Sequence, residues 1–395
     1  MSDGNGARYD LHDGAWRGRP DERPDVRRGP GYLYRPGQIL LEDDQEYTGR
    51  LTAHLHGLGA TRHDELSERI ELAGLPLRAF RIPDEQHIPD LVERLRERDH
   101  DKPVPNVGPN HVYSGEHEVD AGPYGAPEPA PASPEPQLDP AAGSPRVAVL
   151  DTGFDHMVEQ LHPALYRRLI AEGDEDPLRS DGNLWREAGH GTFIAGIIMQ
   201  LAPELRIRQV QVLDPAGVGD DVGVAHRLAM ADAAVINLSL GGYTHGGRPP
   251  VALATALAQL NDSVAVVAAA GNSGSPELFW PAAFNRVIAV GALDMTDGTT
   301  RRAEFSNYGH WVDVYAPGVR VHSTYLDGVY QDPGKHLEHL KGWALWSGTS
   351  FAAPHVAAQI ARLVHGGLTA RQAAHQVLAS ARWEPGIGPV LIPAS

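Results

Sequence analysis

The chain has 395 residues, 42% of them hydrophobic, and carries 34 Lys and Arg against 51 Asp and Glu, a net charge of −17. This length suffices for two or three domains, and the acidic balance argues against non-specific binding to nucleic acid or anionic membranes. The chain has no cysteine, which excludes disulfides, thiolate catalysis and Cys-based metal sites. No segment approaches the roughly 18 consecutive apolar residues of a membrane span.

The first 36 residues are rich in Arg, Asp, Gly and Pro. They offer too little apolar surface to offset the entropy lost on ordering, so we expect a disordered N-terminal arm over residues 1–36. Its start has neither the cationic region nor the apolar stretch of a secretory signal. We therefore expect a cytoplasmic protein, with an extracellular location as the alternative.

Residues 37–114 predict a small α+β domain. Apolar spacing predicts helices over residues 46–60 and 88–99. Strand-like runs lie at residues 37–42, 67–74, 75–82 and 103–114. The resulting order, β-α-β-β-α-β, is the split βαβ pattern of ferredoxin-like domains.

Residues 115–145 contain eight prolines together with Ala, Glu and Gly. This composition is typical of a stiff, extended linker.

From Arg146 to the end of the chain, short apolar runs alternate with helical patterns. The expected strands are residues 147–150, 207–213, 233–240, 264–271 and 287–293, and the expected helices are residues 191–201, 222–232, 250–260 and 352–365. This alternation predicts an α/β domain over residues 146–395, with helices on both faces of a parallel sheet. Ligands of such sheets bind outside the carboxyl ends of the strands.

Four polar residues lie where an expected strand ends or an expected helix begins: Asp151, His190, Asn272 and Ser350. Each one alone has an ordinary structural explanation, as a turn, a structural histidine, a strand end or a helix N-cap. Together they place an acid, a histidine and a serine in the order Asp…His…Ser, one of the known chain orders of a catalytic triad.

The chemistry of acyl transfer explains these residue types. A serine hydroxyl is a poor nucleophile near neutral pH and needs a base such as imidazole within reach. The carboxylate orients the imidazole and stabilises the imidazolium that forms during attack. The Asn272 amide can donate to the oxyanion of the tetrahedral intermediate, and the backbone N–H of Ser350, at a helix start, can supply a second donor.

Ordered motifs extend this pattern along most of residues 146–393: VAVLDTG (147–153), HGTFIAGII (190–198), INLSLGG (236–242), AAGN (269–272), WPAAF (280–284), VIAVGA (287–292), FSNYG (305–309), VDVYAPG (312–318) and SGTSFAAPHVA (347–357). In these motifs the chain resembles the subtilisin-like serine proteases, the subtilases or peptidase family S8. The resemblance implies that Asp151, His190 and Ser350 form the triad and that Asn272 supplies the oxyanion-hole amide.

The resemblance also implies two substrate-binding segments. Ser239, Leu240 and Gly241 would pair with the extended backbone of a substrate, while Ala269, Ala270 and Gly271 would line the pocket for the side chain before the scissile bond. Phe279 could partly fill the floor of that pocket and favour smaller or apolar side chains.

The chain departs from the usual family pattern in three places. Phe193-Ile194 stands where the family usually has His-Val, and Ala358 stands where it usually has glycine. Neither departure touches the proposed chemistry. Residues 197–210 pass almost directly from a helix to a strand, where many secreted relatives carry a loop that binds calcium tightly. We therefore expect no metal at that site, and no cofactor.

The 37–114 unit resembles the inhibitory propeptide of the family in length, element order and final extended run. This implies that it packs on two surface helices of the protease as an intramolecular inhibitor and chaperone, with its tail around residues 111–114 in the cleft like a product. The alternative is an independent binding module. We hypothesise autocleavage near residues 113–115 of a monomeric, self-inhibited zymogen.

The favoured function is a serine endopeptidase that cleaves polypeptides through an acyl-enzyme. One alternative is an inactive subtilase-like binding protein whose N-terminal unit stays in the cleft permanently. Another is an esterase with the same triad. The segment Ser239–Gly242 favours the peptidase, because a small ester has no need of a strand that pairs with peptide backbone.

Overall fold

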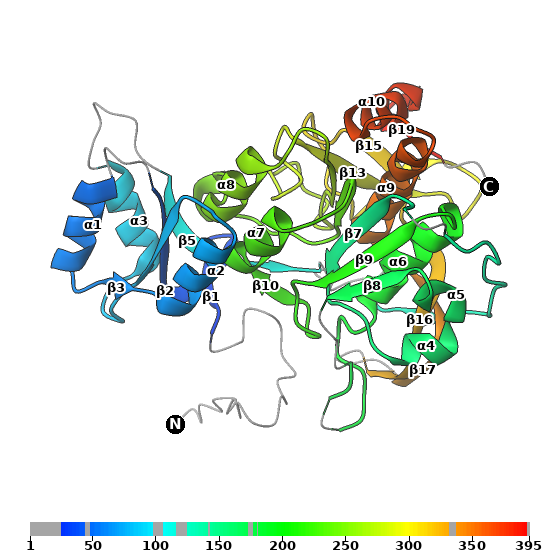
Figure 1. The fold of residues 1–395 in the computed structure, drawn as a ribbon, viewed down its shortest axis with the longest axis horizontal. Coiled ribbons are helices and arrows are strands. Elements are labelled where there is room, and N and C mark those ends of the chain that lie inside the picture. The colour runs from blue at the N-terminus through cyan, green and yellow to red at the C-terminus, as the bar shows by residue number, and fades with distance from the viewer. Residues whose placement is uncertain are drawn as a thin grey trace.

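The computed structural model describes residues 25–43, 48–97, 106–115, 125–140, 143–172, 177–179, 181–331 and 337–392. A small N-terminal unit lies at one end of the molecule, and a larger α/β unit forms the rest (Figure 1). The strand β5 (Val107–Ser114) runs from the small unit into the large one, where it pairs with β10 (Val218–Asp220).

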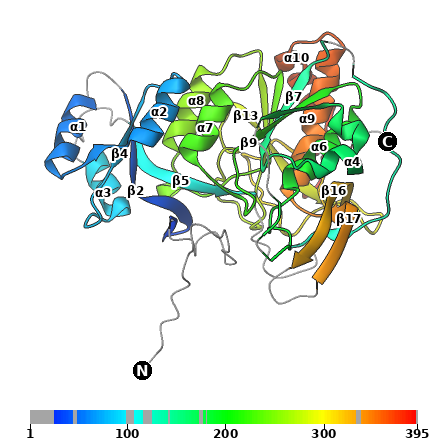
Figure 2. The same ribbon diagram turned by 60° about the horizontal axis from the view of Figure 1, so that its bottom comes forward.

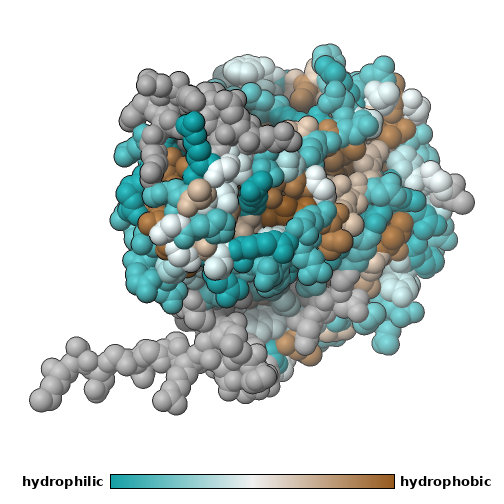
Figure 3. Space-filling model, turned by 60° about the vertical axis from the view of Figure 1, so that its left-hand side comes forward, coloured by the Kyte–Doolittle hydropathy of each residue, from teal (hydrophilic) through white to brown (hydrophobic). Residues whose placement is uncertain are grey.

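The N-terminal unit is an antiparallel sheet in the order β5-β2-β4-β3, with β1 paired to β2. Its other elements are β1 (Arg27–Gly29), β2 (Tyr32–Glu42), α1 (Thr48–Gly57), β3 (Thr61–Arg62), α2 (Asp64–Leu72), β4 (Leu77–Arg81) and α3 (Ile88–Glu97). The helices α1 and α3 cover one face of the sheet, through Leu55, Leu91 and Leu95. The other face, with Leu40 and Ala79, shares a core with the large unit. Seen from the side of this unit, the surface is mainly hydrophilic, with hydrophobic residues gathered near its middle (Figure 3).

The strand predicted over residues 67–74 is wrong, because most of this segment lies in the helix α2. Leu66 and Ile70 are four residues apart, so a helix places both on one face, where they are buried in the core shared with the large unit. The His63 side chain accepts a hydrogen bond from Leu66 N (3.5 Å) and caps the helix start. Parts of three other predicted elements, residues 46–47, 98–99 and 103–105, lie outside the described residues.

The expected disorder of the N-terminal arm is wrong for residues 25–36, and residues 1–24 lie outside the described part of the chain. Val26 is buried together with Val112 and Val218, and Leu33 packs against this cluster. Arg35 pairs with the carboxylates of Asp25 and Asp220. These few apolar residues order the segment because they cover β5 where it enters the large unit.

The large unit has a sheet whose strands β8, β9, β7, β11, β12, β13 and β15 are parallel and adjacent in that order. The sequence predicts the parallel sheet and five of these strands, but not β8 and β15. Their bounds are β7 (Arg146–Asp151), β8 (Leu169–Glu172), β9 (Arg206–Gln211), β11 (Val235–Leu238), β12 (Ala265–Ala269), β13 (Val287–Asp294) and β15 (Val314–Pro317). The short strands β14 (Arg301–Arg302), β18 (Arg382–Glu384) and β19 (Gly388–Val390) extend one side.

Helices cover both faces of this sheet (Figure 2). On one face lie α6 (His190–Leu201), α9 (Thr349–His365) and α10 (Ala370–Ser380), and on the other lie α7 (Asp221–Ala229) and α8 (Val251–Gln259). The alternation within β7 shows the division: Val147 and Val149 belong to the core with α6 and α9, whereas Ala148 and Leu150 belong to the core with α7 and α8. The shorter helices are α4 (Met157–Leu161), α5 (Pro163–Tyr166) and a 3₁₀ turn (His245–Gly247).

A hairpin that the sequence analysis missed holds the Pro-rich linker. It consists of β16 (Val321–Gln331) and β17 (Leu337–Trp346), and the linker strand β6 (Glu128–Pro129) pairs with β17. The linker residues 125–140 are extended, as expected, but they lie against the large unit; residues 116–124 and 141–142 are outside the described residues.

Glu135 anchors this linker to the large unit. One carboxylate oxygen bonds to His162 Nδ1 (2.9 Å) and the other accepts from Ala164 N (2.9 Å), at the start of α5. Burial acts to raise the pKa of Glu135, but the hydrogen bonds from His162 and Ala164 outweigh it and lower the pKa. Farther along, the Arg168 guanidinium donates to Leu138 O. The linker is therefore a bound part of the large unit.

The substitution Glu135→Gln should lower the free energy of unfolding by about 1–3 kcal/mol, because it replaces the charged acceptor of two partly buried hydrogen bonds. Chemical denaturation of the full chain measures this loss. The pKa of Glu135 is lowered from 4.5 in the folded chain. The difference in unfolding free energy between wild type and Glu135→Gln should therefore be complete above pH 4.5, and it should be lost as the pH falls through the lowered pKa. Glu128→Gln, which removes an exposed partner of Arg320, is the matched control and should change stability little.

Candidate active site

Asp151 and His190 form a buried pair at the carboxyl edge of the sheet. Asp151 is the last residue of β7, and its Oδ1 bonds to His190 Nδ1 (2.7 Å) and accepts from Thr152 N (2.8 Å). Their side chains are 0% and 1% exposed. The sheet thus places the carboxylate where it fixes the orientation of the imidazole ring.

The start of α6 holds His190 against aromatic rings. Its N-cap, Gly189, has a φ of +75°, and a Cβ there would lie 3.0 Å from the Leu326 side chain, so glycine is required. The ring of Trp346 meets the imidazole edge-on at 5.4 Å, and the ring of Phe351 lies at 5.3 Å. The imidazole therefore has one orientation available.

The charges around His190 set its protonation. Burial alone would lower its pKa, but the charge and hydrogen bond of Asp151, together with the charge of Glu187, outweigh burial and raise the pKa above 6.5. The sequence analysis missed Glu187, because a glutamate three residues before a histidine has no pattern of its own. It is 98% buried beside the cleft, so it adds to the field on the imidazole.

Ser350 is the second residue of α9, and the N-cap is Gly348. The structural alternative of Ser350 as N-cap is thus wrong. Pro354, four residues later, has no N–H to bond the Ser350 carbonyl, and that carbonyl instead accepts from Ser239 Oγ (2.7 Å). Asn237 Nδ2 in turn donates to Ser239 Oγ (2.9 Å). A buried hydrogen-bond chain therefore fixes the backbone of Ser350.

Asn272 lies beside the start of the same helix. Its Oδ1 accepts from Thr349 N (2.8 Å) and Thr349 Oγ1 (2.9 Å), which orients the amide and leaves Nδ2 as its donor end. Nδ2 lies 3.5 Å from the Cβ position of Gly348. Asn272 and Ser350 are thus brought to the same helix start.

The end of β5 occupies the cleft as the middle of three extended segments. Ser114 N donates to Gly241 O and Gly241 N donates to Ser114 O, both at 3.0 Å. On the other side, β5 pairs antiparallel with β10, and Gly115 N donates to Gly217 O (3.2 Å). We call residues 112–115 the tail. Gly241 therefore pairs with extended backbone.

The Ser350 hydroxyl faces this tail. Its Oγ lies 3.3 Å from Gly115 O and 3.2 Å from Ser239 O, within hydrogen-bond distance of both carbonyls. Among the residues that the structure describes, His190 Nε2 has no hydrogen-bond partner. The Ser350 hydroxyl therefore contacts the tail and Ser239, and it makes no hydrogen bond to the imidazole of His190.

Comparisons with known proteins give the family of this chain. Residues 143–387 match the model of the subtilase family. This chain belongs to the subtilase family of serine proteases. It is 39% identical over 251 residues to the thermophilic serine proteinase of Bacillus sp. (strain AK1), covering 58% of this chain and 55% of that protein.

One more relative and one solved structure are similar to part of this chain. Thermitase of Thermoactinomyces vulgaris is 37% identical over 238 residues, covering 57% of this chain and 76% of thermitase. The crystal structure of a cold adapted subtilisin-like serine proteinase matches with a TM-score of 0.49 and 26% identity, covering 65% of this chain and 92% of that one. This subtilase thus spans little more than half the length of the thermophilic serine proteinase.

The wall residues of the expected side-chain pocket enclose an aromatic ring in this subtilase. Ala269, the last residue of β12, and Ala270 are buried, and Gly271 has a φ of +99°. The Phe279 ring lies between Gly241 and Gly271. A Cβ on Gly241 would lie 2.2 Å from Phe279 Cε1, and a Cβ on Gly271 would lie 3.0 Å from Phe279 Cγ. Leu240 is also fully buried. The ring leaves little depth for a substrate side chain.

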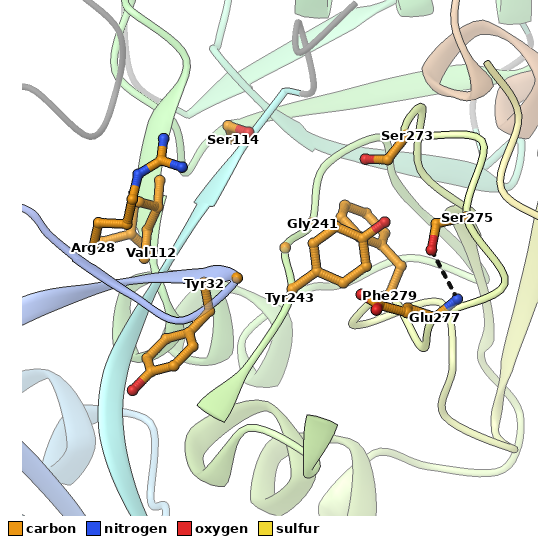
Figure 4. A pocket seen from close by; sticks show the side chains of 13 residues that line it. Arg28, Tyr32, Val112, Ser114, Gly241, Tyr243, Ser273, Ser275, Glu277 and Phe279 are labelled. Carbon is orange, nitrogen blue, oxygen red and sulfur yellow. Dashed lines mark hydrogen bonds between the residues drawn. The ribbon is translucent and has the colours of Figure 1, made fainter. Parts of the chain in front are cut away.

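A cavity of about 300 Å³ lies between the N-terminal unit and the loop of residues 273–279, and Gly241 and Phe279 also line it. Figure 4 shows Val112 and Ser114 of the tail on one side of it and the neighbouring rings of Tyr243 and Phe279 on the other. Those two rings meet at 5.3 Å. The cavity thus follows the tail on the side of Ser114.

No group of His, Asp and Glu side chains within the described part of the chain is arranged to hold a metal ion. The connection from α6 to β9 is short, residues 202–205. None of the described helices is long and apolar enough to cross a bilayer.

The substitution Glu187→Gln should move the acidic limb of the kcat/KM–pH profile to lower pH, by up to about one unit. The negative charge of Glu187 raises the pKa of His190, and the base must be neutral to act, so removal of the charge keeps the base neutral at lower pH. Steady-state kinetics with a small peptide substrate measure this shift. Glu204→Gln, whose carboxylate pairs with Arg362, is the control, and an unmoved limb in Glu187→Gln would contradict the assignment.

Proposed function

We propose that this chain is a serine endopeptidase that its own N-terminal unit holds inactive. The observation that carries the proposal is the tail: a peptide segment lies in extended form between Gly241 and β10, with its Gly115 carbonyl 3.3 Å from Ser350 Oγ. Membership of the subtilase family supports the reaction class. The esterase alternative has no comparable support, because a small ester would not use these paired backbone groups.

The residues of the site have the roles that peptide hydrolysis needs. Ser350 Oγ attacks the substrate carbonyl carbon, and His190 takes the hydroxyl proton and later gives it to the leaving amine. Asp151 stabilises the imidazolium formed between these steps. The Nδ2 group of Asn272 donates to the oxyanion of the tetrahedral intermediate. Water then hydrolyses the acyl-enzyme by the same route.

Polar contacts between the two units support inhibition by the N-terminal unit. His111 lies in β5, directly before the tail, and its Nε2 accepts a hydrogen bond from His245 N (3.0 Å). His245 also bonds to Glu93 Oε1 (2.6 Å) and Tyr32 OH (2.7 Å), both in the N-terminal unit. Burial lowers the pKa of His111 to about 3, so this acceptor stays neutral in the docked form. These contacts hold the unit in place, and the tail then blocks Ser350.

Intact mass and active-site labelling of wild type and Ser350→Ala test the proposal. Wild type should be cut near residues 113–115 and should react with a fluorophosphonate probe, whereas Ser350→Ala should remain full length and unlabelled. Ser347→Ala, which removes an acceptor of Arg320 N outside the site, should behave as wild type. Identical full-length masses would contradict autocleavage, and an unlabelled wild type after removal of the N-terminal unit would favour the inactive binding protein.

The oxyanion role of Asn272 predicts the effect of Asn272→Asp. The aspartate keeps an oxygen to accept from Thr349 but lacks the donor, so kcat should fall about 100- to 1000-fold, as for a comparable donor in subtilisin. Steady-state kinetics and a thermal unfolding curve measure activity and folding together. A folded variant with wild-type kcat would exclude this role.

The Phe279 ring predicts a small side chain before the scissile bond. A peptide library varied at that position should be cleaved fastest with Ala or Gly, since the ring lies between the pocket walls. Phe279→Ala should shift the preference toward larger side chains. A wild-type preference for Phe or Leu would contradict this prediction.

A further inference from the structure

Tyr113 of the tail fills a pocket of its own in the large unit. Its side chain is fully buried and belongs to an apolar cluster with Val222, Leu240 and Ala252. Its ring lies beside Gly242, where a Cβ would come within 3.2 Å of Tyr113 Cδ1. The absence of a side chain at Gly242 therefore makes room for an aromatic ring.

This pocket is distinct from the cavity beside Ser114. Successive side chains of a strand point in opposite directions, and Val112 and Ser114 line the cavity of Figure 4 whereas Tyr113 does not. The pocket also differs from the one that contains Phe279, which lies between Gly241 and Gly271.

A buried carboxylate lies at the end of the Tyr113 pocket. Tyr113 OH donates to Asp221 Oδ1 (3.1 Å), and Asp221 is 0% exposed. The start of α8 holds this carboxylate in position, because Leu253 N donates to Oδ1 (3.0 Å) and Ala252 N donates to Oδ2 (2.9 Å). The acceptor is thus preorganised by the large unit, whatever side chain enters the pocket.

We propose that Asp221 is a specificity-determining residue, and that it selects polypeptide substrates with a tyrosine at the position of Tyr113. The inference rests on the proposed function, because it takes the tail as a stand-in for substrate. A phenylalanine would fill the same apolar space but leave the buried carboxylate without its phenol donor. An acidic side chain would be repelled by the carboxylate, and a small one would leave the pocket empty.

The free energy lost when the buried carboxylate has no phenol donor sets the size of the preference for tyrosine over phenylalanine. Hydrogen bonds to charged groups are stronger than those between neutral groups, and a site built to bond a hydroxyl rejects the analogue that lacks it. We expect tyrosine to be preferred over phenylalanine by about 10- to 100-fold. Burial raises the pKa of Asp221 to about 7 although hydrogen bonds from Ala252 and Leu253 act to lower it, so tests belong at about pH 8.5, where the carboxylate is ionised.

The first experiment needs no catalysis. In full-length Ser350→Ala, amide hydrogen exchange of the tail and of β10 measures how often the tail leaves the cleft. Adding Tyr113→Phe should increase this opening about 10- to 100-fold. The control is Tyr34→Phe, a second buried tyrosine whose ring packs in the core of the N-terminal unit, and it should leave exchange of the tail unchanged. Unchanged exchange in Tyr113→Phe would overturn the proposal.

The second experiment measures selection among substrates. Peptides based on residues 109–118, with Tyr, Phe or O-methyltyrosine at the position of Tyr113, are compared by kcat/KM on the activated enzyme. Tyr should lead Phe about 10- to 100-fold, and O-methyltyrosine should be poorest because its oxygen carries no proton. Equal rates for Tyr and Phe would overturn the proposal.

Variants assign the preference to the carboxylate. Asp221→Asn replaces the charged acceptor with an amide oxygen, which is a weaker acceptor, so the Tyr-to-Phe ratio should fall well below that of wild type. The matched control, Asp262→Asn, removes an exposed carboxylate paired with Arg286 and should retain the ratio. If wild type cleaves no peptide, the proposed function fails. Hydrogen exchange in the Ser350→Ala chain still decides whether the hydrogen bond from the phenol to Asp221 holds the tail in place.

Discussion

Backbone pairing of the tail with both sides of the cleft determines how the two units sit together. Gly241 bonds Ser114 through both main-chain groups, and β10 pairs with the opposite edge of the tail. These bonds use only main-chain atoms, so they suit any extended peptide. The same pairing brings the Gly115 carbonyl to Ser350 and continues into β5 of the N-terminal sheet. In the proposed function, inhibition and substrate binding both use this one hydrogen-bond pattern.

Three buried carboxylates lie along this pattern. Asp151 bonds the imidazole, Glu187 adds to the field on it, and Asp221 meets the phenol of Tyr113. Each is at least 98% buried. A buried charge is costly unless hydrogen bonds or opposite charges compensate it. The backbone N–H groups at Thr152 and at the start of α8 provide part of that compensation.

The helices and strands that could be predicted from the sequence are those with a strong local pattern of apolar residues. Five of the parallel strands and the long helices α6 to α9 have apolar runs that the sequence analysis interpreted correctly to within a few residues, whereas the short strands β8 and β15 were missed. The segment 67–74 is short and has no such run, and only contact with the large unit shows that Leu66 and Ile70 need a helix. The hairpin β16–β17 and the docked linker depend on partners far along the chain, such as Glu135 with His162.

From the sequence alone came most of the parallel sheet, the candidate residues Asp151, His190, Asn272 and Ser350, and the family. The reason is that strand ends and helix starts are local features, and catalytic chemistry restricts which residue types can stand there. Only the tertiary structure decided that Glu187 acts on His190 and that Asp221 closes the Tyr113 pocket. Glu187 has no local signature because its effect on His190 depends on its burial in the large unit. Asp221 has none because its partner Tyr113 reaches it only when the N-terminal unit docks.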